Sequence, residues 1–160
     1  MVGDSLAVGT QPTLGGLLGG WTVTTDARTG RPLAEGMARI RALASRPPVL
    51  AVSLFTNDGP QNTSALRAAV EETLRLQGGQ GCVVWATIVR PAVGGASYDR
   101  ANAVLAELAR TNPSRMRLVP WAQQVADHPE WLAPDGVHAT AAGYAARAGL
   151  YADAARACAR

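Results

Sequence analysis

The stretch Val49-Leu50-Ala51-Val52-Ser53-Leu54-Phe55, followed directly by Thr56-Asn57-Asp58-Gly59, says most about the fold. Its first four side chains are all apolar, so a strand made from them would bury both of its faces. That property is typical of the interior strands of a parallel sheet. Asn, Asp and Gly favour turns, so the strand is expected to end where they begin. The stretch therefore predicts a central strand of a parallel sheet with helices on both sides.

Segments of the same kind alternate with helical patterns along the rest of the chain. The other predicted strands are Trp21–Thr25, Cys82–Val89 and Met116–Pro120. Apolar residues recur at helical spacing between and after the strands, over residues 33–44, 66–76, 101–109 and 141–159. Alternation of strands and helices predicts an α/β fold with a parallel sheet.

The beginning of the chain is abrupt for such a fold. A chain of 160 residues fits one domain, which we expect to span residues 1–160. Only Met1 and Val2 precede Gly3, whereas a strand usually takes about five residues. We therefore expect a truncated first strand, either because it is a stub or because the native polypeptide begins further upstream, and we favour the second. A leader would lie in that upstream part, so the compartment stays open between the cytoplasm and the cell envelope or exterior.

Charge and composition argue against nucleic-acid binding and against a membrane span. The formal net charge is +3, and all basic residues are arginines scattered along the chain with few aromatic residues beside them. This pattern does not predict nucleic-acid binding. No apolar run reaches the roughly 18 residues of a membrane span. The sequence does not indicate an oligomeric state.

The two cysteines, Cys82 and Cys158, form neither a CxxC motif nor part of a metal-ligand cluster. We expect no metal and no organic cofactor. The favoured interpretation is that both cysteines are small buried hydrophobic residues. A disulfide between them is the alternative if the protein is exported.

A serine close to the start of the chain raises the question of catalysis. Ser5 lies in Gly3-Asp4-Ser5-Leu6, and His138 lies in Asp135-Gly136-Val137-His138. A serine hydroxyl becomes a good nucleophile when a base takes its proton and a carboxylate holds that base. Asp135 could turn back to bind one ring nitrogen of His138 and leave the other for Ser5, and Gly136 makes such a turn easy.

The predicted topology brings these residues to one edge of the sheet. Ser5 lies at the head of the first helix, where backbone N–H groups and the helix dipole favour negative charge. His138 lies in the loop after the last predicted strand. Asn57 and Gly30 lie in loops that follow other strands, so the amide of Asn57 and the N–H groups of Gly30 and Ser5 could hold an oxyanion. Ligands of open α/β folds bind at this carboxyl edge.

The chain resembles the SGNH hydrolases, also called GDSL esterases and lipases. Gly3-Asp4-Ser5-Leu6 matches the first sequence block of that family, and Gly30 matches the glycine of the second. Asn57-Asp58 matches the third block, and Asp135-x-x-His138 matches the fifth. The resemblance implies a flavodoxin-like three-layer α/β/α sandwich with a mostly parallel sheet of about five strands.

The resemblance also implies a role for each matched residue. Ser5 would attack an ester carbonyl, His138 would accept and return the proton, and Asp135 would orient His138. The N–H groups of Ser5 and Gly30 and the side chain of Asn57 would hold the oxyanion.

One position departs from the family pattern. The third block normally reads Gly-x-Asn-Asp, but Phe55 stands in place of the glycine. We expect this ring to narrow the acyl pocket or redirect the substrate. Asp58, Arg90 and Trp131 are the other candidate substrate contacts: Arg90 follows the strand Cys82–Val89, and Trp131 lies four residues before Asp135.

These residues predict a serine esterase or deacylase that acts on a small or carbohydrate-linked carboxylic ester, with a small molecule or glycan ester as its partner. The abrupt start of the chain motivates an alternative, an O-acyltransferase domain that acts on cell-envelope sugars. Phe55 and the truncated strand motivate a third hypothesis, a non-catalytic binding module on the same fold.

Overall fold

The computed structural model describes residues 1–159, which contain a five-stranded parallel sheet in the order β2-β1-β3-β4-β5. The strands are β1 (Val2–Gly3), β2 (Asp26–Ala27), β3 (Val49–Ser53), β4 (Cys82–Ala86) and β5 (Met116–Val119). The helices are α1 (Ser5–Leu17), α2 (Leu33–Arg41), α3 (Thr63–Leu76), α4 (Asp99–Thr111), α5 (Trp121–Asp127), the short 3-10 helix η1 (Pro129–Trp131) and α6 (Ala141–Cys158). This strand order is the flavodoxin-like one, so the predicted fold class is confirmed.

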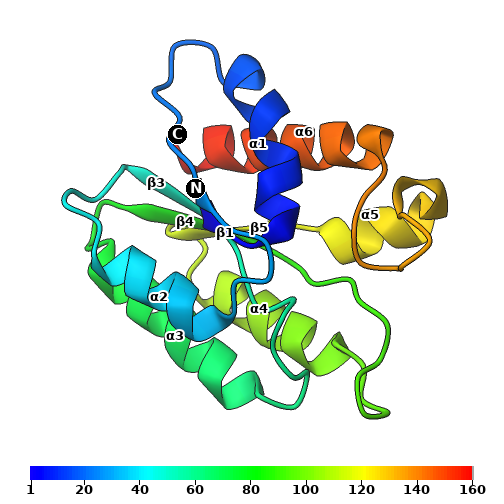
Figure 1. Ribbon diagram of the computed structural model, residues 1–160. Coiled ribbons are helices and arrows are strands. Elements are labelled where there is room, and N and C mark those ends of the chain that lie inside the picture. The colour runs from blue at the N-terminus through cyan, green and yellow to red at the C-terminus, as the bar shows by residue number, and fades with distance from the viewer. Residues whose placement is uncertain (160) are drawn as a thin grey trace.

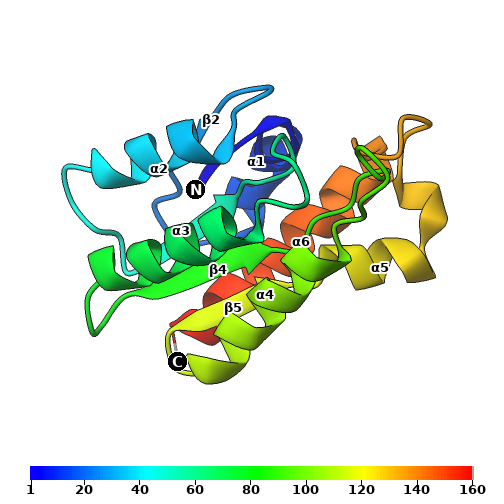
Figure 2. The same ribbon diagram turned by 90° about the horizontal axis from the view of Figure 1, so that it is seen from below.

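Helices cover the sheet on both faces. Helices α1 and α6 lie on one face, and α2, α3 and α4 lie on the other (Figures 1 and 2). Side chains of β4 alternate between the two layers: Val83 and Trp85 join the core under α2, α3 and α4. Val84 and Ala86 join the core under α1 and α6. This two-sided burial is why the central strands are apolar at successive positions.

The edge strand next to β1 differs from the prediction. Trp21–Thr25 does not form a strand, and β2 is instead the two residues Asp26–Ala27 that follow it. β2 is this short because β1 has only two residues to pair with it: Val2 pairs with Asp26, and Gly3 pairs with Ala27. The expected truncation of the first strand is confirmed, since β1 has two residues. Helix α5 was not predicted from the sequence.

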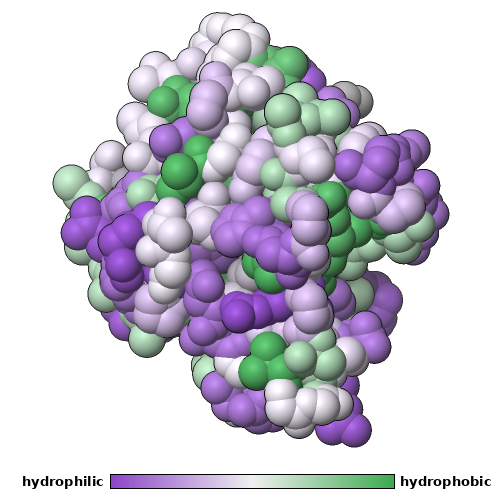
Figure 3. All heavy atoms as spheres, turned by 45° about the vertical axis from the view of Figure 1, so that its right-hand side comes forward, coloured by the Kyte–Doolittle hydropathy of each residue, from purple (hydrophilic) through white to green (hydrophobic). Residues whose placement is uncertain are grey.

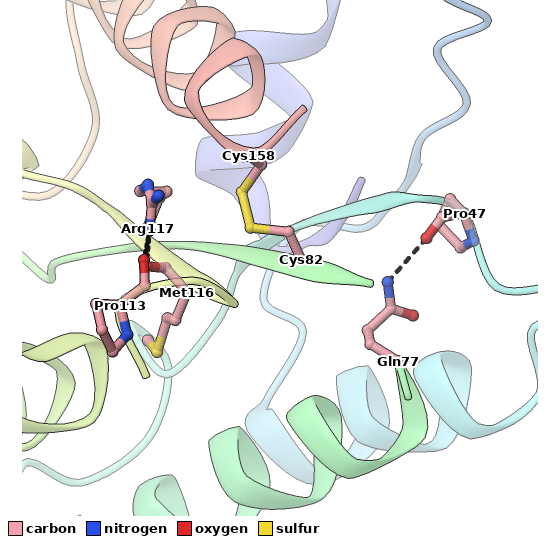
Figure 4. The surroundings of a disulfide bond; sticks show 7 residues. All are labelled: Pro47, Gln77, Cys82, Pro113, Met116, Arg117 and Cys158. Carbon is pink, nitrogen blue, oxygen red and sulfur yellow. Dashed lines mark hydrogen bonds between the residues drawn. A yellow bond between two sulfur atoms is a disulfide. The ribbon is translucent and has the colours of Figure 1, made fainter. Parts of the chain in front are cut away.

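The favoured interpretation of the cysteines is wrong. Cys82 and Cys158 form a disulfide that joins the first residue of β4 to the last residue of α6 (Figure 4). Their Cα atoms are 5.7 Å apart, a separation typical of disulfides. The two residues are 76 positions apart, so only the packing of α6 against the sheet brings them together.

On the face drawn in Figure 3, hydrophobic residues form separate patches among hydrophilic ones. None of the helices within residues 1–159 is both long and apolar enough to cross a membrane.

Candidate active site

Ser5 is the first residue of α1, and only Asp4 separates it from the end of β1. Asp4 caps this helix, because its Oδ1 accepts a hydrogen bond from the backbone N–H of Leu6 at 3.0 Å. The preceding Gly3 is required by packing: a Cβ atom there would lie 2.3 Å from the Cβ atom of Ala7. The Gly-Asp-Ser sequence therefore makes a tight passage from strand to helix with the serine at the helix N-terminus.

His138 lies in the loop between η1 and α6, and Asp135 shapes that loop. Oδ1 of Asp135 accepts hydrogen bonds from the backbone N–H groups of Val137 and His138, each at 2.9 Å. Gly136 allows the turn because its φ is +68°. Oδ2 of Asp135 then lies 2.6 Å from Nδ1 of His138, and Nε2 of His138 lies 3.0 Å from Oγ of Ser5.

The carboxyl group of Asp135 stays ionised over a wide pH range. The hydrogen bond with His138 and the two backbone N–H donors lower the pKa of Asp135 to about 2. A carboxylate at this position accepts a hydrogen bond from Nδ1–H of His138 and so leaves Nε2 unprotonated toward Ser5. The three residues therefore form a continuous chain of hydrogen bonds from carboxylate to imidazole to hydroxyl.

Three possible oxyanion donors lie in segments that follow the neighbouring strands β1, β2 and β3 at the carboxyl edge of the sheet. Within residues 1–159, the backbone N–H groups of Ser5 and Gly30 donate to no protein acceptor. Gly30 has a φ of +73°, and nothing lies within 4 Å of where its Cβ atom would be, so its backbone is open to a ligand. Nδ2 of Asn57 donates to the carbonyl of Arg31 at 3.2 Å, which leaves its second N–H available.

Arg31, which the sequence showed only as one of many scattered arginines, fastens the Gly30 loop to β1. Its buried guanidinium donates to the carbonyl of Gly3 at 3.1 Å and to Oδ1 of Asp26 at 2.7 Å. Its own carbonyl accepts from Asn57. Arg31 therefore links the segments that carry Gly30 and Asn57 to the strand that precedes Ser5.

The expectation that Phe55 contacts the substrate is wrong. Its side chain is fully buried and packs edge-to-face against Tyr98, with ring centroids 6.3 Å apart. Its backbone keeps a φ of +84°, a conformation that favours glycine. The residue therefore retains the backbone geometry of a glycine while its ring fills the core.

The other candidate substrate contacts make interactions within the protein. Oδ2 of Asp58 accepts from the backbone N–H of Leu33 at 2.8 Å, at the start of α2. Nη1 of Arg90 donates to the carbonyl of Thr56 at 2.5 Å. Trp131 stacks on Trp121, with centroids 6.2 Å apart. Asp58, Arg90 and Trp131 are partly exposed, so their contact with substrate stays a prediction.

Two residues connected to Asp4, the neighbour of Ser5, were not predicted from the sequence. Ser53 and Arg147 are both buried and hydrogen-bonded to each other. The only sequence signal was a charged residue within the Ala-rich stretch of residues 141–159, flanked by Gly143 and Tyr151 at helical spacing.

Comparison with protein-family models found no match, and a search among curated proteins found no significant relative. Solved structures do match. The C-terminal catalytic domain of peptidoglycan O-acetyltransferase A (OatA) from Streptococcus pneumoniae superposes with a TM-score of 0.82 at 20% identity, over 98% of this chain and 91% of that one. A lipase/acylhydrolase from Enterococcus faecalis gives 0.76 at 19% identity, over 95% and 91%. A GDSL-like lipase from Bacteroides thetaiotaomicron gives 0.76 at 15% identity, over 97% and 85%.

These likenesses establish the fold. The chain has the α/β sandwich of the SGNH hydrolases, the class that includes GDSL lipases and acylhydrolases, over nearly its whole length. The sequence resemblance predicted this fold, and the prediction is confirmed.

Proposed function

We propose that this protein is a serine esterase or deacylase of the SGNH type, which hydrolyses a small or carbohydrate-linked carboxylic ester through an acyl-enzyme on Ser5. The observation that supports it best is the hydrogen-bonded chain from Asp135 through His138 to Ser5, at 2.6 Å and 3.0 Å. Both distances are those of a nucleophile held by its base and a base held by its orienting acid.

In the first half of the reaction, Oγ of Ser5 attacks the carbonyl carbon as Nε2 of His138 takes the hydroxyl proton. Asp135 stabilises the imidazolium that forms. The carbonyl oxygen becomes an oxyanion and accepts hydrogen bonds from the N–H groups of Ser5 and Gly30 and from Nδ2 of Asn57. When the intermediate collapses, His138 returns its proton to the departing alkoxide, and the acyl group stays on Ser5.

In the second half, a water molecule attacks the acyl-enzyme while His138 takes one of its protons. The second tetrahedral intermediate uses the same oxyanion donors. Its collapse releases the carboxylic acid and returns the proton to Oγ of Ser5. The enzyme is then ready for the next ester.

The test compares Ser5→Ala with the parent on p-nitrophenyl acetate. Removing the nucleophile of a triad lowers kcat by several orders of magnitude, so a rate at the uncatalysed background is expected. A matched control is Ser64→Ala, which removes another serine hydroxyl near the start of α3. Equal hydrolysis by the parent and Ser5→Ala would show that this mechanism is wrong.

An O-acyltransferase that acts on cell-envelope sugars is the second candidate. It is supported by the likeness to the peptidoglycan O-acetyltransferase domain, which covers 98% of this chain. The disulfide also fits an oxidising compartment, where such bonds persist. The acyl-enzyme would be the same, but a sugar hydroxyl would replace water in the second half. Product analysis with an added sugar acceptor separates the two: free acetate alone favours the esterase, and acylated sugar favours the transferase.

The third hypothesis, a binding module without catalysis, predicts that Ser5 is unreactive. A fluorophosphonate probe should label the parent and leave Ser5→Ala unlabelled if Ser5 is an activated nucleophile. Absence of labelling in the parent would favour the binding module.

A further inference from the structure

Two buried residues of opposite charge, Asp4 and Arg147, are linked through Ser53 outside the proposed triad. Asp4, the residue before Ser5, has no exposed side-chain surface, and Arg147 of α6 is 1% exposed. Ser53, the last residue of β3, connects them: Nη2 of Arg147 donates to Oγ of Ser53 at 2.9 Å. Oγ of Ser53 in turn donates to Oδ1 of Asp4 at 3.2 Å. The guanidinium, the hydroxyl and the carboxylate therefore form one chain.

The geometry of Asp4 determines where Ser5 lies. Its Oδ1 holds the N–H of Leu6, its own N–H donates to the carbonyl of Ser53 at 2.9 Å, and its carbonyl accepts from Val8 at 3.1 Å. Asp4 is therefore held by hydrogen bonds both to Ser53 of β3 and to the first turn of α1. A rotation of this residue would turn the first residue of α1, which carries both the hydroxyl and one N–H of the proposed oxyanion hole.

An isolated carboxylate is costly to bury. Burial raises the pKa of Asp4 above its ordinary value, and the positive charge of Arg147 acts in the opposite direction. Tyr144 and Tyr151 of α6 are the other titratable groups near Asp4, and the pKa of each is raised, so both are neutral at pH 7. Arg147 is thus the one charged group that compensates Asp4 among the residues described.

The surroundings of Arg147 fit a guanidinium better than an ammonium group. Its Cζ atom lies 5.2 Å from the ring centroid of Trp121 and 5.3 Å from that of Tyr151. A planar guanidinium can contact both rings while one nitrogen reaches Ser53. The hydroxyl of Tyr151 donates to the carbonyl of Val52 at 2.8 Å, so the Tyr151 ring beside the Arg147 guanidinium is fixed to β3.

We propose that Arg147 is a positioning residue that acts through Ser53 to hold the Asp4 carboxylate as the cap of α1 and thereby orients Ser5 for attack. The inference rests on the proposed function, because it concerns the reactivity of that serine. Arg147 does not touch the substrate. Its positive charge opposes the rise in the pKa of Asp4 that burial causes, and its hydrogen bond to Ser53 keeps the cap in place.

The first experiment measures kcat and KM of p-nitrophenyl acetate hydrolysis against pH for Arg147→Met, Arg147→Lys and the control Arg156→Met. Arg156 is an exposed arginine of the same helix, paired with Asp153. We expect Arg147→Met to lower kcat about ten- to a hundredfold with little change in KM, the effect of a slightly misplaced nucleophile. The acid limb of the pH–kcat profile, where kcat falls as the pH is lowered, should also move to higher pH in Arg147→Met. Without the arginine, the Asp4 carboxylate takes up a proton more readily. Arg147→Lys keeps the charge, so its acid limb should stay near that of the parent while kcat falls.

A double variant separates positioning from general damage to the fold. In an Asp4→Asn background the cap is already neutral, so Arg147→Met should no longer move the acid limb. If Arg147→Met shifts the profile equally in the parent and in the Asp4→Asn background, or if it behaves like Arg156→Met, the proposal is wrong.

The second experiment does not depend on activity. The titration of the Asp4 side chain is followed by carboxyl ¹³C NMR in the Ser5→Ala protein, with and without Arg147→Met. We expect the Asp4 titration to move to higher pH when the arginine is removed. If Arg147→Met does not fold, Arg147→Lys with Ser53→Ala is measured instead, and loss of the hydrogen bond should move the titration in the same direction. An unchanged titration overturns the link between Arg147 and Asp4, whereas an inactive parent enzyme with a shifted titration overturns only the proposed function.

Discussion

Oγ of Ser5 lies 3.0 Å from Nε2 of His138, although the two residues are 133 positions apart in the sequence. Both stand at the carboxyl edge of the sheet, Ser5 two residues after the end of β1 and His138 in the segment that follows β5 and α5. A parallel sheet brings the ends of its strands together at one edge, so the first and last loops of the chain can share a site. The relationship explains how a serine at the very start of the described chain gains a base.

Asn57→Ala should lower kcat by about 10²- to 10³-fold, the effect of removing one donor of an oxyanion hole. KM should change little, because the donor acts mainly on the charge that develops in the transition state. The measurement is steady-state hydrolysis of p-nitrophenyl acetate. Asn62→Ala is the control, since Asn62 is exposed and its side chain makes no cap hydrogen bond at α3. Equal losses of kcat in the two variants would contradict the assignment of Asn57 to the oxyanion hole.

Asp135→Asn should reduce kcat by about 10⁴-fold, because an amide can hold the imidazole with the wrong nitrogen protonated. The acid limb of the parent should not arise from Asp135, whose pKa is about 2. Circular dichroism should show the same fold in both proteins. Activity of Asp135→Asn close to that of the parent would contradict the role given to this carboxylate.

The same pKa makes a prediction for stability. Because folding lowers the pKa of Asp135 from 3.8 to about 2, its contribution to stability is present above pH 3.8 and is lost as the pH falls through 2. The Tm of the parent should therefore exceed that of Asp135→Asn near neutral pH, and the difference should shrink in acid. The side chain is half-exposed, so a small difference is expected. A Tm difference that grows on acidification would contradict this sign.

Much of the fold follows from the local sequence. The strand Val49–Ser53 and the helix start at Ser5 are visible in apolar runs and glycine positions, because burial on both faces and a tight turn each leave a local pattern. The juxtaposition of the proposed triad was predictable for a related reason, since Asp135 and His138 are close in sequence and the topology brings them to Ser5. The edge strand Asp26–Ala27 was not predictable, because its length is set by its partner β1 rather than by its own residues.

Long-range contacts account for the other misses. Arg147 and Ser53 are 94 positions apart, so neither stretch of sequence shows that Arg147 compensates the buried Asp4 through Ser53. Phe55 stands where the family pattern has glycine, and the pattern shows the backbone requirement at that position. It does not show that the ring turns inward to meet Tyr98, 43 positions later in the chain.

Removal of the disulfide should lower stability without lowering activity. The bond closes a loop of 76 positions, for which loop entropy predicts a loss of about 4.5 kcal/mol in the free energy of unfolding. Cys82 is the first residue of β4, at the edge opposite the proposed active site, so kcat of the folded protein should be unchanged. The test is urea unfolding and hydrolysis by the double variant Cys82→Ala, Cys158→Ala. A large fall in kcat with unchanged stability would contradict this separation of roles.

Phe55 allows backbone strain and side-chain burial to be measured apart. Phe55→Ala should cost about 3–5 kcal/mol, the usual loss for a buried phenylalanine, and it keeps a side chain at a φ of +84°. Phe55→Gly removes one more carbon but relieves the left-handed strain, about 1–2 kcal/mol for a residue with a Cβ atom. The larger conformational entropy of glycine in the unfolded chain offsets part of this gain in stability. We therefore expect Phe55→Gly to be more stable than Phe55→Ala by about 1 kcal/mol in urea unfolding.

Leu54 provides the matched control for Phe55. It is equally buried, and its φ is not positive, so the same pair of substitutions tests burial without strain. There the order should reverse, with Leu54→Ala more stable than Leu54→Gly by up to about 1 kcal/mol, because glycine now brings only its entropic cost. If alanine is also the more stable residue at position 55, the positive φ carries no strain. The glycine of the family pattern would then need another explanation than backbone conformation.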